Sequence, residues 1–137
     1  AGEVPVMVCC CESADTERVA ALAAAGVDVF RGECGETGRI DLFGLLMEFG
    51  IRRWSNVLVE GGSEVLGSLA DGGFIDEAHV FLSPKLVGGR AALGAVGGRG
   101  LAQVPETANL ECVETRSVGQ DVYWRGVRSR VEESRDC

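Results

Sequence analysis

Residues 58–67 read LVEGGSEVLG, an apolar segment that ends in a carboxylate and two glycines before a serine and a second glutamate. The apolar residues up to Glu60 are typical of a buried strand, and the residues from Ser63 onward have the spacing of a short helix. Paired glycines let the backbone approach a ligand closely, and a serine at a helix start can cap the helix or donate to a phosphate. The stretch therefore predicts a strand-to-helix turn, and its spacing alone leaves open whether the turn is purely structural or binds a cofactor.

Strand and helix signals alternate along the rest of the chain. Apolar runs bounded by polar residues predict strands at 5–11, 27–30, 56–60 and 77–83, and a C-terminal hairpin at 109–126. Capping residues and helical spacing predict helices over 13–26, 41–50 and 63–71, the first of them beginning at Ser13 or Asp15. Strands that are apolar on both faces and alternate with helices are typical of a parallel sheet covered on two sides. The predicted fold class is therefore α/β, a three-layer α/β/α domain whose mostly parallel sheet ends in an antiparallel hairpin.

Length, charge and hydropathy limit the classes of function. With 137 residues, 46% of them hydrophobic, the chain fits one domain, which we expect over 1–126, followed by a polar tail at 127–137. The net charge of −8 argues against a nucleic-acid-binding surface, because neutralising phosphates needs clustered Lys and Arg. No apolar run is long enough to span a bilayer, so we expect no membrane partner and a cytoplasmic location, or an organelle if a leader was removed.

The cysteines and the single histidine predict no metal site. Three of the six cysteines are consecutive, Cys9 to Cys11, and neighbouring side chains on a strand point to opposite faces, which is poor disulfide spacing. We expect reduced, packed thiols. The paired Cys and His spacings of zinc sites are missing from the sequence, and His79 lies inside an apolar strand, where we expect a packed side chain.

Three short motifs in one order carry a family resemblance. VEGG at 59–62, IDE at 75–77 and PKLVGG at 84–89 together are far more specific than any one of them alone. From Pro5 to about Trp124 the chain resembles the reductase domain of bacterial-type riboflavin biosynthesis, a pyrimidine reductase with the dihydrofolate-reductase-like fold. The resemblance is densest over residues 56–89, and the late VGQDVYWRG resembles the closing hairpin of that family.

The resemblance implies NADPH-dependent reduction of 5-amino-6-(5-phosphoribosylamino)uracil. A hydride passes from the nicotinamide to C1 of the ribosyl group, and the sugar opens to a ribityl chain. By resemblance, Gly61, Gly62, Ser63 and Glu64 hold the cofactor diphosphate through backbone N–H groups. Glu60 corresponds to a catalytic carboxylate beside the nicotinamide and the substrate. No metal or flavin is required, because the nicotinamide carries the chemistry.

Two further positions come from the same resemblance. Cys10 and Cys11, at the end of the first strand, would border the 2′-phosphate of the adenosine, where many relatives place hydroxyl side chains; strand packing alone also explains these cysteines. Lys85, in PKLVGG, would approach the substrate rim, although a lysine after a buried strand is more often a solvated charge.

The chain departs from the family at its start, and this leaves three interpretations. The full reductase domain begins with a strand that carries substrate-contacting residues, and no such strand precedes PVMVCCC at 5–11. The first interpretation is a pyrimidine reductase acting on a small-molecule substrate, as a homodimer or with a companion chain that completes the fold. The second is a non-catalytic, reductase-derived structural or interaction subunit of a larger assembly. The third is a folate-type reductase, against which Glu60 argues mildly.

Overall fold

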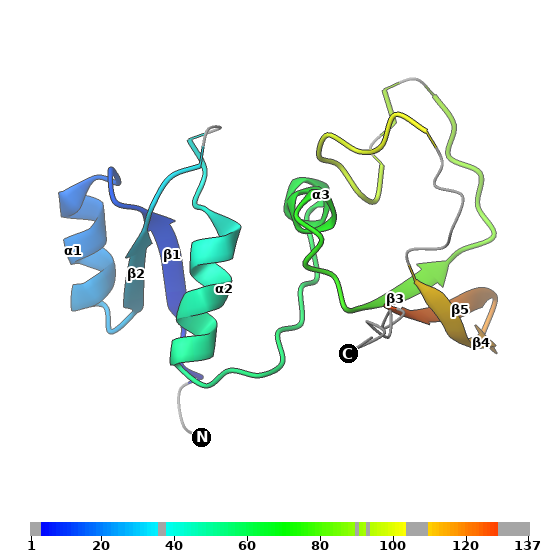
Figure 1. Cartoon of the computed structure of the whole chain (residues 1–137), viewed down its shortest axis with the longest axis horizontal. Helices are drawn as coiled ribbons and strands as arrows, with labels where there is room; N and C mark the ends of the chain where they lie inside the picture. Colours follow the sequence, from blue (N-terminus) through cyan, green and yellow to red (C-terminus); the bar gives the residue numbers. More distant parts are fainter. Residues whose placement is uncertain (1–3, 36–37, 90, 93, 104–109, 129–137) are drawn as a thin grey trace, which may run out of the picture. The chain divides into compact units, whose positions relative to one another are not determined.

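The chain forms two compact units, Ala1–Leu58 and Val59–Cys137. Figure 1 shows its computed structural model, which describes residues 4–35, 38–89, 91–92, 94–103 and 110–128. The single domain expected over 1–126 stays a prediction. The expected polar tail lies outside the described residues from position 129 onward.

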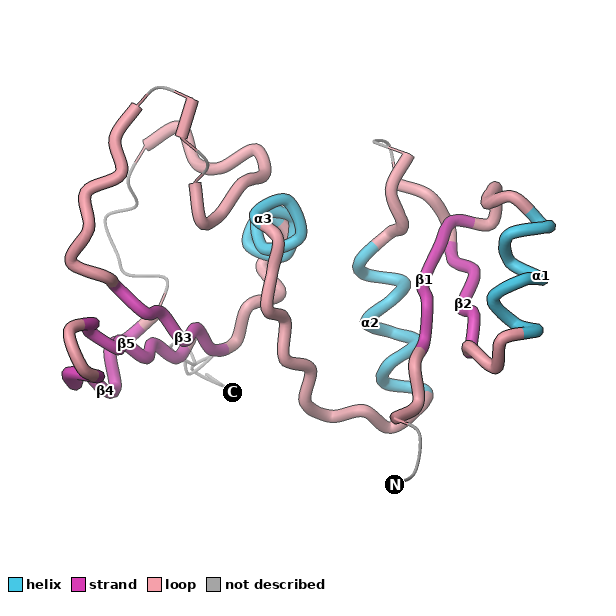
Figure 2. Tube along the Cα trace, turned by 180° about the vertical axis from the view of Figure 1, so that it is seen from behind, coloured by secondary structure: helices cyan, strands magenta, loops and turns pink. Residues whose placement is uncertain are grey.

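The first unit is a parallel strand pair with two helices. Strand β1 (Met7–Cys11) pairs with β2 (Asp28–Gly32), from Met7 beside Asp28 to Cys11 beside Gly32. Helix α1 (Thr16–Ala24) connects the two strands, and α2 (Leu42–Ile51) follows β2. The strand pair lies between the two helices (Figures 1 and 2). All four elements lie where the sequence predicts them.

Aspartates begin both helices of this unit. The Asp15 carboxylate accepts the Arg18 N–H at 2.9 Å, so Asp15 and not Ser13 is the N-cap of α1. The Asp41 carboxylate accepts the Gly44 N–H at 2.7 Å at the start of α2. Such caps satisfy helix N–H groups that have no partner within the helix.

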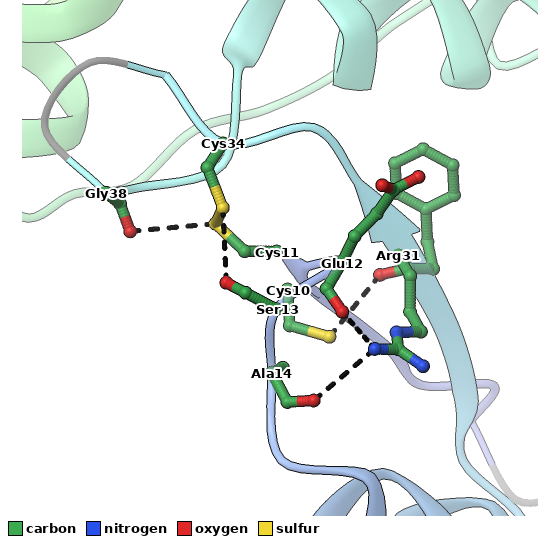
Figure 3. The surroundings of a disulfide bond; sticks show 9 residues. Cys10, Cys11, Glu12, Ser13, Ala14, Arg31, Cys34 and Gly38 are labelled. Carbon is green, nitrogen blue, oxygen red and sulfur yellow. Dashed lines mark hydrogen bonds between the residues drawn. A yellow bond between two sulfur atoms is a disulfide. The ribbon is translucent and has the colours of Figure 1, made fainter.

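The expectation of reduced thiols is wrong for two of the cysteines. Cys11 and Cys34 form a disulfide whose Cα atoms are 5.3 Å apart (Figure 3). The spacing of the consecutive cysteines does not indicate a partner 23 positions away in the sequence. Parallel pairing sets Cys11 beside Gly32, and the chain leaving β2 then carries Cys34 back to the end of β1. Among the described residues, Cys9, Cys10 and Cys112 keep free thiols, and burial raises the pKa of the Cys9 thiol.

The second unit combines one helix with an antiparallel sheet. Helix α3 (Ser63–Asp71) is followed by β3 (Glu77–Leu82), and the hairpin of β4 (Glu111–Val118) and β5 (Asp121–Val127) completes the unit. The strand order is β3-β5-β4. The predicted hairpin is confirmed, with Gly119 in its turn at a φ of 62°. Leu69 of α3 and Tyr123 of β5 are the buried apolar residues of the described chain.

The α/β class is confirmed, but one predicted strand is missing from the described structure. Residues 56–60 form no strand, and Val57 and Leu58 are exposed. A strand exists only where a neighbour takes up its backbone hydrogen bonds, and the apolar pattern cannot supply that neighbour. The described strands therefore make one parallel pair and two antiparallel pairs, not a mostly parallel sheet. None of the described helices is long and apolar enough to cross a bilayer.

Candidate active site

The turn that precedes α3 is built from two glycines with open space above them. Gly61 has a φ of 134°, a conformation that favours glycine, and Gly62 is the N-cap of α3. A Cβ placed on either glycine would meet nothing within 4 Å. Unlike α1 and α2, helix α3 has no side-chain cap hydrogen bond. The backbone at the start of α3 is thus accessible to a ligand.

A second glycine-rich segment packs against α3. We call residues 94–100 the glycine loop. The Gly97 N–H donates to the Ser63 carbonyl at 2.8 Å. Gly67 of α3 is buried, and a Cβ on it would overlap the backbone of Gly97. The close approach of loop and helix therefore depends on glycine at position 67, and a Cβ on Gly97 would come within 3.1 Å of the Ser63 carbonyl oxygen.

The C-terminal turn of α3 fixes the other end of the glycine loop. The Asp71 carboxylate accepts the Arg99 N–H at 2.6 Å and the Gly100 N–H at 3.0 Å. These hydrogen bonds, that of Arg99 foremost, hold the pKa of the Asp71 carboxyl below its ordinary value. Sequence reasoning missed Gly97 and Asp71 as parts of this site. The available signal was the run of glycines at 94, 97, 98 and 100, which marks close backbone packing.

The carboxylate of Glu60 is exposed at the entrance to this turn. Among the described residues, no group forms a hydrogen bond or ion pair with it. A carboxylate that no neighbour engages is available to a cationic or hydrogen-bond-donating ligand. Lys85 is also exposed, and its backbone N–H donates to the Ser83 carbonyl at 2.8 Å in a local turn. No contact in the described structure joins Lys85 to Glu60.

Cys10 and Cys11 belong to the first unit, and both sulfur atoms are engaged there. The Cys10 Sγ donates to the Phe30 carbonyl at 3.8 Å. Cys11 is bonded to Cys34, whose Sγ lies 3.5 Å from the hydroxyl of Ser13 (Figure 3). Because a disulfide sulfur carries no hydrogen, the Ser13 hydroxyl is the donor in this contact.

The first unit also holds a cavity of about 280 Å³ at the carboxyl ends of β1 and β2. Glu12 follows β1, and Arg31 and Gly32 end β2. The side chains around the cavity are mostly charged, with apolar residues beside them: Glu12, Phe30, Arg31, Glu33, Asp41 and Leu45. Ligands of open α/β sheets bind at the carboxyl ends of parallel strands. The cavity therefore lies where such a fold binds ligands.

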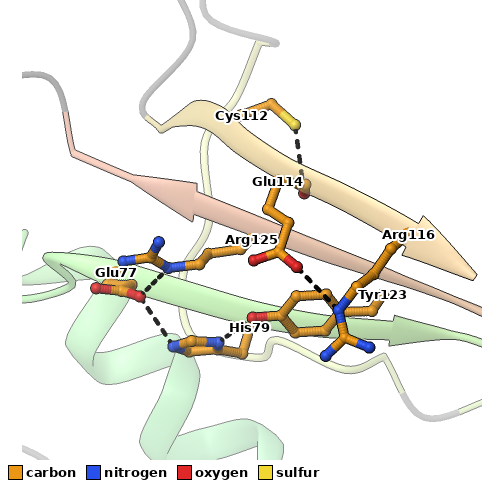
Figure 4. Close-up of polar contacts among 7 residues, drawn as sticks. All are labelled: Glu77, His79, Cys112, Glu114, Arg116, Tyr123 and Arg125. Carbon is orange, nitrogen blue, oxygen red and sulfur yellow. Dashed lines mark hydrogen bonds and ion pairs between the residues drawn. The ribbon is translucent and has the colours of Figure 1, made fainter. Parts of the chain in front are cut away.

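The sheet of the second unit carries a polar cluster on one face (Figure 4). His79 Nε2 lies 3.0 Å from the Glu77 carboxylate, and His79 Nδ1 lies 2.7 Å from the Tyr123 hydroxyl. Arg125 also pairs with Glu77 and holds the pKa of that carboxyl below its ordinary value. The prediction of a packed His79 is wrong: its ring is nearly half exposed, because it lies on the face that carries these charged partners. No group of three or more described side chains has the geometry to hold a metal ion.

Comparison with known proteins identifies relatives of the chain. The family model of the RibD C-terminal domain matches residues 1–124. The riboflavin biosynthesis protein RibD of Actinobacillus pleuropneumoniae is 32% identical over 110 residues, which cover 80% of this chain and 29% of that protein. The 2,5-diamino-6-ribosylamino-4(3H)-pyrimidinone 5′-phosphate reductase of Methanothermobacter thermautotrophicus is 36% identical over 88% of this chain and 54% of its own length. The chain thus spans about half or less of these relatives.

Solved structures show the same fold at lower identity. A pyrimidine reductase-like protein from Corynebacterium diphtheriae matches 91% of this chain and 50% of its own, with a TM-score of 0.68 and 18% identity. The RibD protein of Acinetobacter baumannii matches 91% of this chain and 31% of its own, with a TM-score of 0.60 and 18% identity. Both likenesses support the expected dihydrofolate-reductase-like architecture.

Proposed function

Since the chain belongs to the RibD C-terminal domain family, we propose that it contributes the cofactor-binding part of a riboflavin-pathway pyrimidine reductase. The substrate is the phosphoribosylaminouracil that the family resemblance implies. A reduced nicotinamide dinucleotide supplies the hydride when bound. The observation that carries the proposal is the open glycine turn before α3, which has the residue types of the family motif and no side chain in the way.

The residues of the turn have different roles in binding. Gly61 and Gly62 leave room for a diphosphate, and the first N–H groups of a helix donate to anions at the positive end of its dipole. Ser63 and Glu64 provide the next backbone positions of α3. The glycine loop supports the start of α3 through the hydrogen bond between Gly97 and Ser63. A preorganised donor set of this kind costs little reorganisation on binding.

Glu60 is proposed as the catalytic carboxylate. Removal of a ribosyl ring oxygen from C1 leaves positive charge on the carbon and nitrogen of the reacting group, and a nearby carboxylate stabilises such charge. Glu60 precedes the cofactor turn directly and has no partner among the described residues that would neutralise it. Lys85 remains a proposal as a substrate-rim cation, carried by the PKLVGG motif.

The parts of the dinucleotide fit this chain unequally. The diphosphate fits the turn at Gly61 and Gly62. The family resemblance implies NADPH, with Cys10 and Cys11 at the border of its 2′-phosphate. In the structure the Cys10 thiol donates to a backbone carbonyl, and Cys11 carries no hydrogen. The 2′-phosphate is therefore the part of the cofactor for which the chain offers the poorest donor set.

The test is turnover by the protein with its substrate. We expect oxidation of the reduced dinucleotide only when the phosphoribosylaminouracil is present, and a fall in kcat of roughly 100-fold for Glu60→Gln. Glu17→Gln, an exposed carboxylate of α1, is the matched control and should retain full activity. Equal rates for wild type and Glu60→Gln would contradict the catalytic role.

Exposed apolar residues of β3 favour a second candidate function. Phe81 and Leu82 are 61% and 56% exposed. Such a strand suits a non-catalytic, reductase-derived subunit that contacts another chain, as a homodimer or with a companion. Sedimentation of the wild type against Phe81→Ser tests this candidate. A monomer for both proteins would remove the support that β3 gives it.

A further inference from the structure

Three residues of α3 contact the glycine loop, and they lie along one side of the helix. Ser63, Gly67 and Asp71 are four residues apart in sequence, so their positions follow one stripe of the helix surface. The Ser63 carbonyl accepts the Gly97 N–H at 2.8 Å, and Gly67 lies against the Gly97 backbone. Asp71 accepts two N–H groups of residues 99–100. The glycine loop therefore follows α3 from its first turn to its last.

Asp71 holds the glycine loop by the loop backbone more than by its charged side chain. One carboxylate oxygen accepts the Arg99 N–H at 2.6 Å, and the other accepts the Gly100 N–H at 3.0 Å. The Arg99 side chain is 89% exposed, and its Nε lies 3.8 Å from the carboxylate. An ion pair with so exposed a partner contributes little. Hydrogen bonds to an ionised acceptor are stronger, so the two backbone contacts are the main anchor of the loop at this end.

This anchor limits where the Gly97 N–H can lie. Four of the seven residues of the glycine loop are glycine, and glycine has more backbone freedom than any other residue. Gly97 and Arg99 are two residues apart, and two residues span at most about 7 Å. Fixing Arg99 therefore keeps Gly97 close to α3. Without the anchor, the loop would populate conformations in which Gly97 leaves the Ser63 carbonyl.

The contact of Gly97 reaches the backbone that the proposed function assigns to the diphosphate. The Ser63 carbonyl belongs to the first turn of α3. Because a peptide unit is planar, a hydrogen bond that fixes its carbonyl also fixes the direction of its N–H. The same hydrogen bond polarises the peptide unit and strengthens its N–H as a donor. The glycine loop thus orients the first turn of α3 for an anion.

We propose that Asp71 is a positioning residue for the dinucleotide: it anchors the glycine loop at the end of α3, and the loop orients the diphosphate-binding turn at the start of α3. The inference rests on the proposed function, which assigns the diphosphate to residues 61–64. In this role Asp71 acts through the loop and does not contact the ligand. Coupling between two sites is reciprocal, so dinucleotide binding strengthens the contacts of Asp71 with the loop by the same factor.

The first test measures the affinity of the whole chain for NADH and for NADPH by calorimetry. Asp71→Asn keeps the shape of the side chain and replaces one acceptor by an NH₂ group that faces a backbone N–H. Both dinucleotides should therefore bind at least about fivefold more weakly to this variant. Arg99→Gln is the matched control, because it keeps the backbone N–H and removes the exposed guanidinium. Its affinities should stay within about twofold of the wild type.

The second test uses the wild type, so it does not depend on the folding of a variant. Saturating NADH should raise the protection of the Arg99 and Gly100 amides from hydrogen exchange about fivefold or more. The Gly119 amide, in the hairpin turn of the same unit, is the internal control and should gain less protection. A merely structural role of Asp71 would not distinguish these amides.

The outcomes separate this inference from the proposed function. If the dinucleotides bind the wild type and Asp71→Asn equally well, the inference is overturned and the proposed function stands. The same holds if NADH binds and protects the Arg99 and Gly100 amides no more than the Gly119 amide. If neither dinucleotide binds the wild type, both are overturned.

Discussion

The two units differ in whether side chains engage the backbone at the starts of their helices. In the first unit, Asp15 and Asp41 cap the helices, and the disulfide between Cys11 and Cys34 joins the end of β1 to the segment after β2. In the second unit, α3 begins at Gly62 without a side-chain cap. Backbone that side chains satisfy stabilises the fold, and backbone that they leave open can bind a ligand. The capped helix starts and the disulfide of the first unit therefore stabilise the fold, and the uncapped start of α3 can bind a ligand.

The largest effect should come from breaking the disulfide of the first unit. Cys34→Ser opens a loop of 23 residues in sequence separation, and chain entropy places the loss in unfolding free energy at about 3 kcal/mol. Denaturant unfolding under non-reducing conditions measures it. Cys10→Ser, which keeps the disulfide, should lose far less. Equal stability of wild type and Cys34→Ser, or six titratable thiols in the folded wild type, would contradict the bridge.

The same change, glycine to alanine, should have opposite effects on the stability of α3 and α2. Gly67→Ala should cost about 1–3 kcal/mol of unfolding free energy, because the new methyl group overlaps the Gly97 backbone. Gly50→Ala in α2 is the matched control: its Cβ meets nothing within 4 Å, so the change should stabilise the helix by up to roughly 1 kcal/mol. Thermal unfolding of both variants gives the comparison. A neutral Gly67→Ala would show that the glycine loop does not pack on α3.

The smallest expected effect is a dependence of the stability of the glycine loop on pH. The folded-state pKa of Asp71 is lowered, chiefly by the Arg99 N–H. The stability that the ionised Asp71 carboxylate contributes is therefore complete above its ordinary pKa near 3.8. It is lost as the pH falls through the lowered pKa of the folded state. Protection of the Arg99 and Gly100 amides from hydrogen exchange, relative to the intrinsic rate at the same pH, should fall at acid pH.

Asp71→Asn removes this dependence at its source. The variant should show lower protection of the two amides already at neutral pH and little further change in protection on acidification. Asp76→Asn, in the same unit, should behave as the wild type does. Amides of Arg99 and Gly100 that exchange at the same rate in Asp71→Asn and wild type would mean that the carboxylate does not hold the loop.

Local features were predictable from the sequence, and contacts between distant segments were not. The helices, the hairpin at Gly119 and the cap at Asp15 depend on neighbours a few residues away, which the sequence displays directly. The strand predicted at 56–60 failed because pairing requires a partner that no local pattern specifies. The disulfide, the contact between Gly67 and Gly97, and the hydrogen bond between His79 and Tyr123 join residues 23 to 44 positions apart, so they follow from topology and not from spacing.

The same difference between local features and distant contacts applies to the candidate site. The motif VEGGSE predicted the turn and its glycines, because the residue types that matter for the turn are consecutive in the sequence. The engagement of Arg31 by backbone carbonyls, and the support of Ser63 by Gly97, depend on the folded arrangement. The cysteines of β1 show the difference most clearly, since their sequence suggested free thiols and the fold pairs Cys11 with Cys34.

The proposed function requires that the backbone before and at the start of α3 binds the diphosphate of a nicotinamide dinucleotide. The most direct measurement is a titration of the isotope-labelled chain with NADH, followed by the amide resonances of residues 61–64, in the wild type and in Gly62→Asp. We expect saturable shifts that are largest at these amides in the wild type and absent in Gly62→Asp, where a carboxylate enters the open space. Shifts of the same size in Gly62→Asp, or none at residues 61–64 while NADH binds, would contradict it.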